Sequence, residues 1–138
     1  MSLHPLLLAE MLEDEVAVAR TELGDRIADL AVIGDEVFCR LTDTNVGDAT
    51  IRLDGREYDG EPFKVAVVDS HGVLAERASW PGTLFYTVHP VLGRGFVCVR
   101  GTFEYHCHPS HLGDRWDTYR YTLRLPRLLD HLVRKAGR

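Results

Sequence analysis

The chain has 138 residues, of which 45% are hydrophobic and 27% charged, and its formal net charge is −5. This size and composition are typical of one globular domain over residues 1–138 that buries a core without disulfide bonds. The negative charge argues against nucleic acid as a partner, and no apolar run is long enough to cross a membrane.

The first predicted element is an amphipathic helix over residues 5–23. Apolar residues recur there at steps of three and four, Pro5 suits a first helical turn and Gly24 suits the end. After Gly24 the pattern changes to short apolar or alternating runs separated by turn residues, which predicts strands. The predicted strands are 27–33, 36–41, 49–53, 63–68, 84–88 and 96–100. No helix separates them, so we expect an antiparallel meander.

A second helical stripe of leucines begins at residue 125, with Pro126 at its first turn. The expected fold class is therefore α+β, with an N-terminal helix, an antiparallel meander, an irregular segment and a C-terminal helix. The three cysteines form no even set of disulfide partners, and nothing at the N-terminus resembles a signal peptide. We expect a reducing, cytoplasmic setting, in which clustered Cys and His indicate metal binding or catalysis.

The segment EYHCHPSH, residues 104–111, concentrates metal-seeking side chains. On a strand, Glu104, His106 and His108 would share one face with their Cβ atoms about 6–7 Å apart. A turn after Pro109 would bring His111 back towards them. Imidazole nitrogens with a carboxylate suit Zn²⁺, so the pattern predicts a zinc site.

Cys98 has two competing interpretations. It is the natural further zinc ligand if the chain reverses near Gly101, because in a straight strand Cys98 and Glu104 would be about 20 Å apart. Alternatively it is a nucleophile whose thiolate attacks a carbonyl carbon or a thioester. The two exclude each other, because a zinc-bound thiolate is a poor nucleophile. Cys107 is expected to point away from the site and to be packed, or to be a ligand only if the segment is not a strand. Cys39 is expected to be a core residue.

Four other residues near the site have structural and functional interpretations. Trp80 and Trp116 are expected to be core aromatics or aromatics that cover the site. Asp114 and Asp117 either orient a ligating histidine or form ion pairs with neighbouring arginines, namely Arg115 or Arg120.

The order of elements and several runs of residues resemble the ubiquitin-conjugating enzyme superfamily. EPFKVAVVD (61–69) looks like its later meander strands, and SWPGTLFYTVHP (79–90) like its approach to a His-Pro motif. His89-Pro90 followed by GFVCV (95–99) is similar to the family's His-Pro-Asn motif and active-site cysteine. The resemblance implies a UBC-like fold and places Cys98 at the thioester-forming position. Val91 stands where the family has the Asn that polarises the acyl oxygen during lysine attack.

EYHCHPSHLGDRW, residues 104–116, is also similar to a bacterial family named for a Cys-Glu-His-His (CEHH) signature and predicted to bind metal. This resemblance implies metal ligands at Cys98, Glu104, His106 and His111, with His108 as a further candidate.

The resemblance also implies partners, namely a ubiquitin-like protein and activating-enzyme-like or JAB-peptidase-like proteins. We therefore expect a zinc-binding protein of a bacterial ubiquitin-like modification pathway. Three alternatives stay open: a transthiolation enzyme with Cys98 as nucleophile, a metal-dependent hydrolase, and a non-catalytic partner-binding scaffold.

Overall fold

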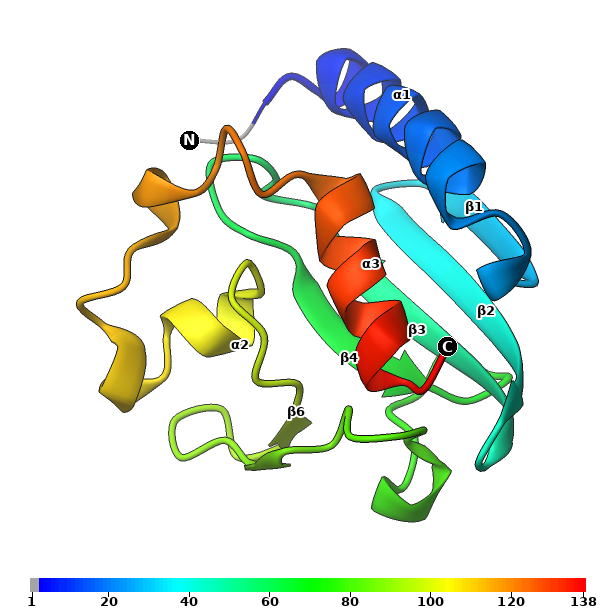
Figure 1. Cartoon of the computed structure of the whole chain (residues 1–138). Coiled ribbons are helices and arrows are strands. Elements are labelled where there is room, and N and C mark those ends of the chain that lie inside the picture. Colours follow the sequence, from blue (N-terminus) through cyan, green and yellow to red (C-terminus); the bar gives the residue numbers. More distant parts are fainter. Residues whose placement is uncertain (1–2) are drawn as a thin grey trace.

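The computed structural model describes residues 3–138 and follows the expected order of helix, antiparallel sheet, irregular segment and helix (Figure 1). The α-helices are α1 (Pro5–Leu23), α2 (Phe103–His106) and α3 (Leu125–Lys135). The strands are β1 (Asp29–Ile33), β2 (Glu36–Thr44), β3 (Gly47–Asp54), β4 (Lys64–Val68), β5 (Thr87–Val88) and β6 (Gly95–Phe96). Short 3-10 turns are η1 (Gly24–Arg26), η2 (Arg77–Ser79), η3 (Pro109–His111) and η4 (Trp116–Thr118). The predicted α+β class is confirmed.

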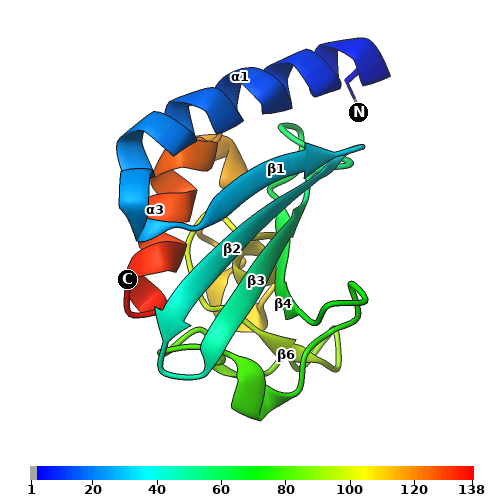
Figure 2. The same cartoon turned by 90° about the vertical axis from the view of Figure 1, so that its right-hand side faces the viewer.

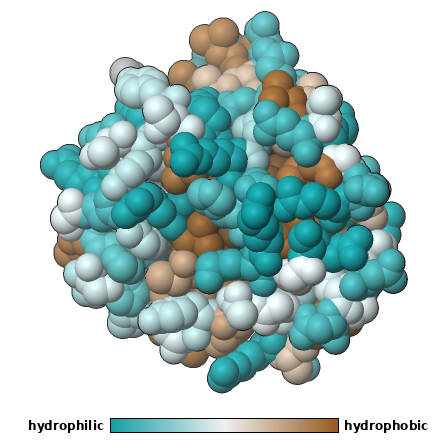
Figure 3. All heavy atoms as spheres, viewed as in Figure 1, coloured by the Kyte–Doolittle hydropathy of each residue, from teal (hydrophilic) through white to brown (hydrophobic). Residues whose placement is uncertain are grey.

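α1 covers the predicted residues because one apolar stripe of the helix is buried. The stripe consists of Leu8, Leu12, Val16, Ala19 and Leu23. At the N-terminus, Leu6 N donates to the His4 side chain at 3.2 Å, which satisfies one amide of the first turn. Leu6 and Leu7 are exposed, and an apolar area lies at the upper tip of the molecule, over the start of α1 (Figure 3). No helix among residues 3–138 combines the length and apolar character needed to cross a membrane.

β1 to β4 form one antiparallel sheet in sequential order, which confirms the first four predicted strands. Gly34 adopts φ +64° in the turn between β1 and β2, a conformation that glycine adopts without strain. Along β2 the side chains of Val37, Cys39 and Leu41 are buried, while the residues between them are partly or fully exposed. Cys39 is therefore a core residue, as expected. Its environment raises the pKa of the thiol to about 12, chiefly through burial.

The segment predicted as a strand at residues 84–88 forms only the two-residue β5. Its first residue forms no strand pair, since Leu84 N donates to Pro81 O at 3.2 Å. Thr83, just before the predicted strand, donates its N–H to Lys135 O at 2.8 Å. Leu84 is nevertheless fully buried. Tyr86 and Val88, by contrast, are exposed. The apolar run therefore predicted burial correctly only at Leu84, and most of the predicted strand is absent.

α3 lies over one face of the sheet and contacts α1 (Figures 1 and 2). Its start is fixed by a group of charged side chains between the two helices. Glu15 accepts a hydrogen bond from Leu125 N at 3.0 Å and pairs with Arg124 at 2.5 Å. Arg124 also pairs with Asp59 at 2.9 Å. A carboxylate of α1 thus binds the N-terminal end of α3, where the helix dipole favours negative charge.

The predicted strand 96–100 is also shortened, because β6 ends at residue 96 and the chain reverses near Gly101. Gly101 has φ +99°, and Thr102 N donates to Val99 O at 3.1 Å across the turn. A side chain at Gly101 would meet Leu123, since an added Cβ would lie 2.6 Å from its Cδ2 atom. The chain thus reverses near Gly101, which is the condition that the zinc-ligand interpretation of Cys98 set.

Gly101→Ala should therefore lower the free energy of unfolding by about 2 to 4 kcal/mol, through positive-φ strain and overpacking. Gly113→Ala is the matched control, because an added Cβ there has no atom within 4 Å. Urea titration at fixed pH measures both. Equal effects of the two substitutions would contradict the close packing of Gly101 against Leu123.

Candidate functional site: Cys98 and its surrounding histidines

The segment that carries the predicted metal ligands is helical, so the expectation of a strand is wrong. Thr102 caps the short helix α2, and its hydroxyl accepts a hydrogen bond from Tyr105 N at 3.2 Å. Residues two apart in a helix point to nearly opposite sides. Glu104 and His106 therefore do not share a face, and His108 lies beyond the helix end.

Glu104 is fully buried and bound to protein on both carboxylate oxygens. Oε1 accepts from Val65 N at 2.8 Å, and Oε2 pairs with Arg94 Nη2 at 2.8 Å. Burial raises the pKa of Glu104 against the opposing effect of these two partners. The carboxylate joins α2 to β4 and to the loop that precedes β6.

His89 is a buried residue with a single tautomer. Its Nδ1 accepts hydrogen bonds from Val91 N and Leu92 N, each at 3.1 Å. The ring proton must therefore be on Nε2, which donates to Glu104 O at 2.9 Å. His89 thus binds its own loop to α2, and both of its ring nitrogens form hydrogen bonds with backbone groups.

Both ring nitrogens of His106 also form hydrogen bonds with backbone groups. Gly101 N donates to its Nε2 at 3.1 Å, so its Nδ1 carries the proton and donates to Asp114 O at 2.7 Å. Burial lowers the pKa of His106. The imidazole thus bridges the turn at Gly101 and the loop at Asp114.

Cys98 and His111 are brought together. Val97 and Val99 are buried, and Cys98 between them is only half-buried. Its Sγ lies 3.8 Å from His111 Nε2. Burial raises the pKa of the Cys98 thiol, and the Lys135 ammonium acts in the opposite direction. At neutral pH the group is therefore a thiol, and the His111 side chain lies beside it.

His108 lies next to this pair. Its ring centroid is 5.6 Å from that of His111 and 5.3 Å from that of His89. Its Nδ1 accepts from Ser110 N at 3.1 Å. Desolvation lowers the pKa of His108, and His89 and His111 add to the effect.

The structure thus separates the predicted zinc ligands. It places the thiol of Cys98 at His111, with His108 nearby, whereas the carboxylate of Glu104 and both nitrogens of His106 are bound to other protein groups. Among residues 3–138, no group of three or more His, Cys, Asp or Glu side chains is arranged to hold a metal ion. The zinc site stays a prediction.

Asp114 gathers three donors on one carboxylate. Tyr105 OH and Tyr119 OH each lie 2.5 Å from it, on Oδ2 and Oδ1 respectively. Arg100 Nε donates to Oδ2 at 2.9 Å. These hydrogen bonds lower the pKa of Asp114 well below its usual range. The carboxylate itself contacts no histidine, so orientation of His106 comes from the Asp114 main chain.

Asp117 and the two tryptophans near the site have structural roles. Asp117 forms ion pairs with Arg115 at 3.6 Å and with Arg120 at 3.9 Å. Trp80 and Trp116 are buried core residues, as expected. No role was predicted for Lys135 or Tyr105, because nothing in the spacing of residues relates either of them to Cys98.

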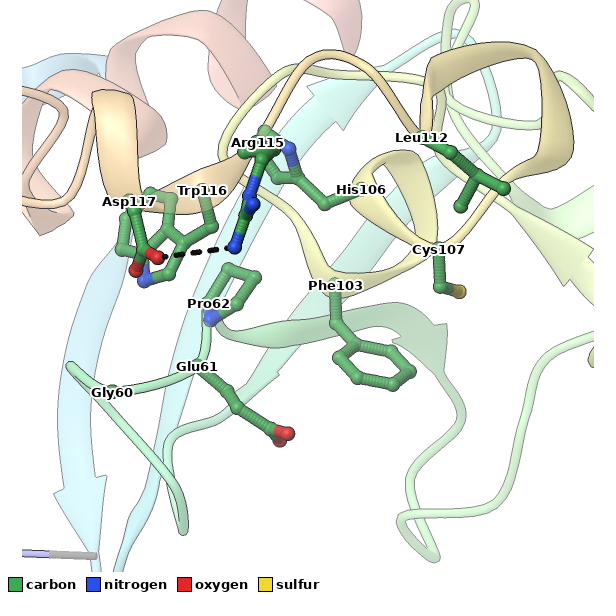
Figure 4. Close-up of a pocket in the computed structure, with 10 residues that line it drawn as sticks. All are labelled: Gly60, Glu61, Pro62, Phe103, His106, Cys107, Leu112, Arg115, Trp116 and Asp117. Atoms are coloured by element: carbon green, nitrogen blue, oxygen red, sulfur yellow. Dashed lines mark ion pairs between the residues drawn. The ribbon is translucent and has the colours of Figure 1, made fainter. Parts of the chain in front are cut away.

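A pocket of about 290 Å³ lies between the turn at residues 60–62 and the α2–η4 segment (Figure 4). Phe103, His106 and Cys107 line it on one side, and the Arg115–Asp117 ion pair lies on another. Cys98 is not among its lining residues. Cys107 lines this pocket, and its thiol lies 3.5 Å from His89 Nε2. Cys107 is therefore not part of the Cys98–His111 pair.

No protein-family model and no curated protein matches the chain. Its function therefore has to be inferred from its own residues and their geometry.

Glu104→Ala should lower the free energy of unfolding by about 3 to 5 kcal/mol, because it leaves the partly buried Arg94 and the buried amide of Val65 without their partner. Glu104→Gln keeps an acceptor for Val65 N and should lose less. Urea titration in the presence of a chelator measures both. An alanine variant as stable as the wild type would refute the structural role of Glu104.

Alkylation of Cys98 by iodoacetamide should increase with pH to a midpoint above that of an unstructured cysteine peptide, because burial raises the pKa of the thiol. Lys135→Met should move this midpoint further up, since it removes the opposing positive charge. Lys64→Met is the matched control, because Lys64 acts on Cys107. Peptide mass spectrometry follows each thiol separately. A midpoint at Cys98 that responds to Lys64 and not to Lys135 would be inconsistent with this assignment.

Proposed function

We propose that the chain is a ubiquitin-conjugating-like domain in which Cys98 accepts an acyl group as a thioester and passes it on. The observation that carries the proposal is the half-buried Cys98 thiol with His111 Nε2 at 3.8 Å. A cysteine of raised pKa needs a base to become a nucleophile, and an imidazole at this position supplies one. The helix–meander–helix order and the His89-Pro90 loop ahead of Cys98 support the resemblance.

The proposed reaction is an exchange between two thiols. His111 takes the proton of Cys98, and Sγ attacks the thioester carbonyl of a carrier protein. The carbon–sulfur bond to the carrier breaks, and the carrier thiolate leaves and takes up a proton. The Cys98 thioester then gives its acyl group to the next nucleophile. Val91 stands where the resembled family has its Asn, so the resemblance supports acceptance of the acyl group better than its delivery to lysine.

Zinc binding is the second candidate, favoured by the same Cys98–His111 contact with His108 at its side. Glu104 and His106 would each have to give up a protein hydrogen bond to join the site. Without them, Cys98, His108 and His111 remain as ligands, and a fourth position would be open. Bound zinc would supply Lewis acidity there, as a metal-dependent hydrolase requires. A scaffold without either chemistry is the third candidate.

We further propose that the partners are a ubiquitin-like protein and its activating enzyme, with a JAB-type peptidase in the same bacterial pathway. The compartment proposed is the cytoplasm. All three cysteines are free thiols. Thioester exchange at Cys98 requires a reduced thiol, and the cytoplasm is a compartment that keeps thiols reduced.

Incubation with a glycine-ended peptide thioester should give an adduct on Cys98 that hydroxylamine removes. Intact mass and peptide mapping measure it. Cys98→Ser should abolish the adduct, and Cys107→Ser should keep it. His111→Ala should slow its formation by at least about 10-fold, because general-base assistance is lost. An adduct that persists in Cys98→Ser would exclude Cys98 as the acyl carrier.

Metal content separates the two leading candidates. Tag-free wild-type protein is compared with Cys98→Ser, His111→Ala and His106→Ala by elemental analysis. The thioester proposal predicts that no zinc depends on Cys98, so Cys98→Ser should have the same zinc content as the wild type. One zinc per chain that is lost in Cys98→Ser would support zinc binding and overturn the thioester proposal. Zinc lost only in His106→Ala would leave Cys98 free for acyl chemistry.

A further inference from the structure

The imidazole beside Cys98 is held from one side by an aromatic ring. The Tyr105 and His111 rings are stacked, with centroids 4.1 Å apart and planes 13° from parallel. His111 ends the 3-10 turn η3, and its neighbours Ser110 and Leu112 are exposed. An imidazole in such a segment samples several rotamers unless a contact restricts it. The Tyr105 ring is that contact, and it fixes the plane in which Nε2 meets the thiol.

The Tyr105 ring is itself fixed at its far end. Its hydroxyl donates to Asp114 Oδ2 at 2.5 Å, and Arg100, two residues beyond Cys98, donates to the same oxygen at 2.9 Å. Asp114 also donates its backbone N–H to His111 O at 2.9 Å. The carboxylate thus connects the cysteine side of the pair with the histidine side, through charge-assisted hydrogen bonds.

We propose that Tyr105 is a positioning residue that keeps His111 Nε2 directed at Cys98 Sγ, with Asp114 as its anchor. This proposal rests on the proposed thiol chemistry of Cys98. Tyr105 donates no proton to the reaction and touches no reacting atom. It acts by reducing the conformations of His111 that must be lost before the proton transfer, and misplacement of a catalytic base is costly.

Tyr119 provides a matched control within the same cluster. Its hydroxyl donates to Asp114 Oδ1 at 2.5 Å, a bond of the same kind as that of Tyr105. Its ring, however, faces His106 at a centroid distance of 6.1 Å and receives the Arg100 guanidinium at 4.7 Å. Tyr119→Phe therefore removes an equivalent hydrogen bond without affecting the ring that lies on His111.

The experiment measures the rate of Cys98 acylation by the peptide thioester and, separately, of Cys98 alkylation by iodoacetamide at one fixed pH. Tyr105→Phe should slow both by about 5- to 50-fold, because the ring that remains loses its anchor on Asp114 and no longer holds His111 in one orientation. Tyr119→Phe should change both by less than about 2-fold, because the Tyr119 ring faces His106 and Arg100 and does not hold His111. Equal slowing by the two substitutions would show that only the stability of the Asp114 cluster matters, and would overturn the proposal.

A double-mutant cycle distinguishes positioning from a general structural role. In the His111→Ala background, Tyr105→Phe should have no further effect on either rate, since the residue through which it acts is gone. Additive slowing would overturn the proposal. If wild-type Cys98 is not acylated at all, the thioester function fails, and the alkylation rates still decide whether Tyr105 positions His111.

A spectroscopic measurement on the wild type needs no variant to fold. Stacking on Tyr105 should shift the ring-proton resonances of His111 upfield from those of an unstacked histidine. Absence of this shift would show that the two rings do not stack in solution, and the proposal would fail.

Discussion

Buried Glu104 connects α2 to β4, 39 residues away, and to the loop between β5 and β6. Its two carboxylate oxygens bind β4 through Val65 N and the loop before β6 through Arg94. Its main-chain carbonyl accepts a hydrogen bond from His89 Nε2. A carboxylate removed from water is stabilised only when such partners surround it. The position of α2, and with it the course of the chain from residue 98 to residue 114, depends on this residue.

Much of the polar chemistry in this region therefore serves the architecture. His89 uses both ring nitrogens to hold its loop, and His106 uses both of its own to bridge a turn and a loop. Both imidazoles are fixed in one tautomer by backbone groups, so neither is free to exchange protons with a substrate. The side chains left for chemistry are Cys98 and His111, with His108 beside them.

The regular elements could be predicted because their signals are local. The apolar stripe of α1 and the alternation of β2 are each contained within one element, and the structure has both where they were expected. The turn at Gly101 was also foreseeable, since glycine permits φ +99°.

The predicted strand at the histidines failed for a physical reason. A spacing of two residues indicates a shared face only in a strand, and Thr102 caps a helix there instead. The hydrogen-bond and ion-pair partners of the polar side chains could not be predicted for another reason. The partner of Glu104 is an amide 39 residues away, and that of Arg124 is a carboxylate 109 residues away. No local pattern encodes such pairs.

The packing of Gly101 against Leu123, and of Thr83 against the end of α3, means that the last part of the chain shapes the segment around Cys98. Synthesis on the ribosome proceeds in the opposite sense, so Cys98 emerges before the residues that build its surroundings. Every new molecule consequently passes through a stage in which the cysteine has neither its turn nor its histidine. The domain can complete the arrangement around Cys98 only after α3 has been synthesised, so this part of the fold forms later than the sheet that precedes it in the chain.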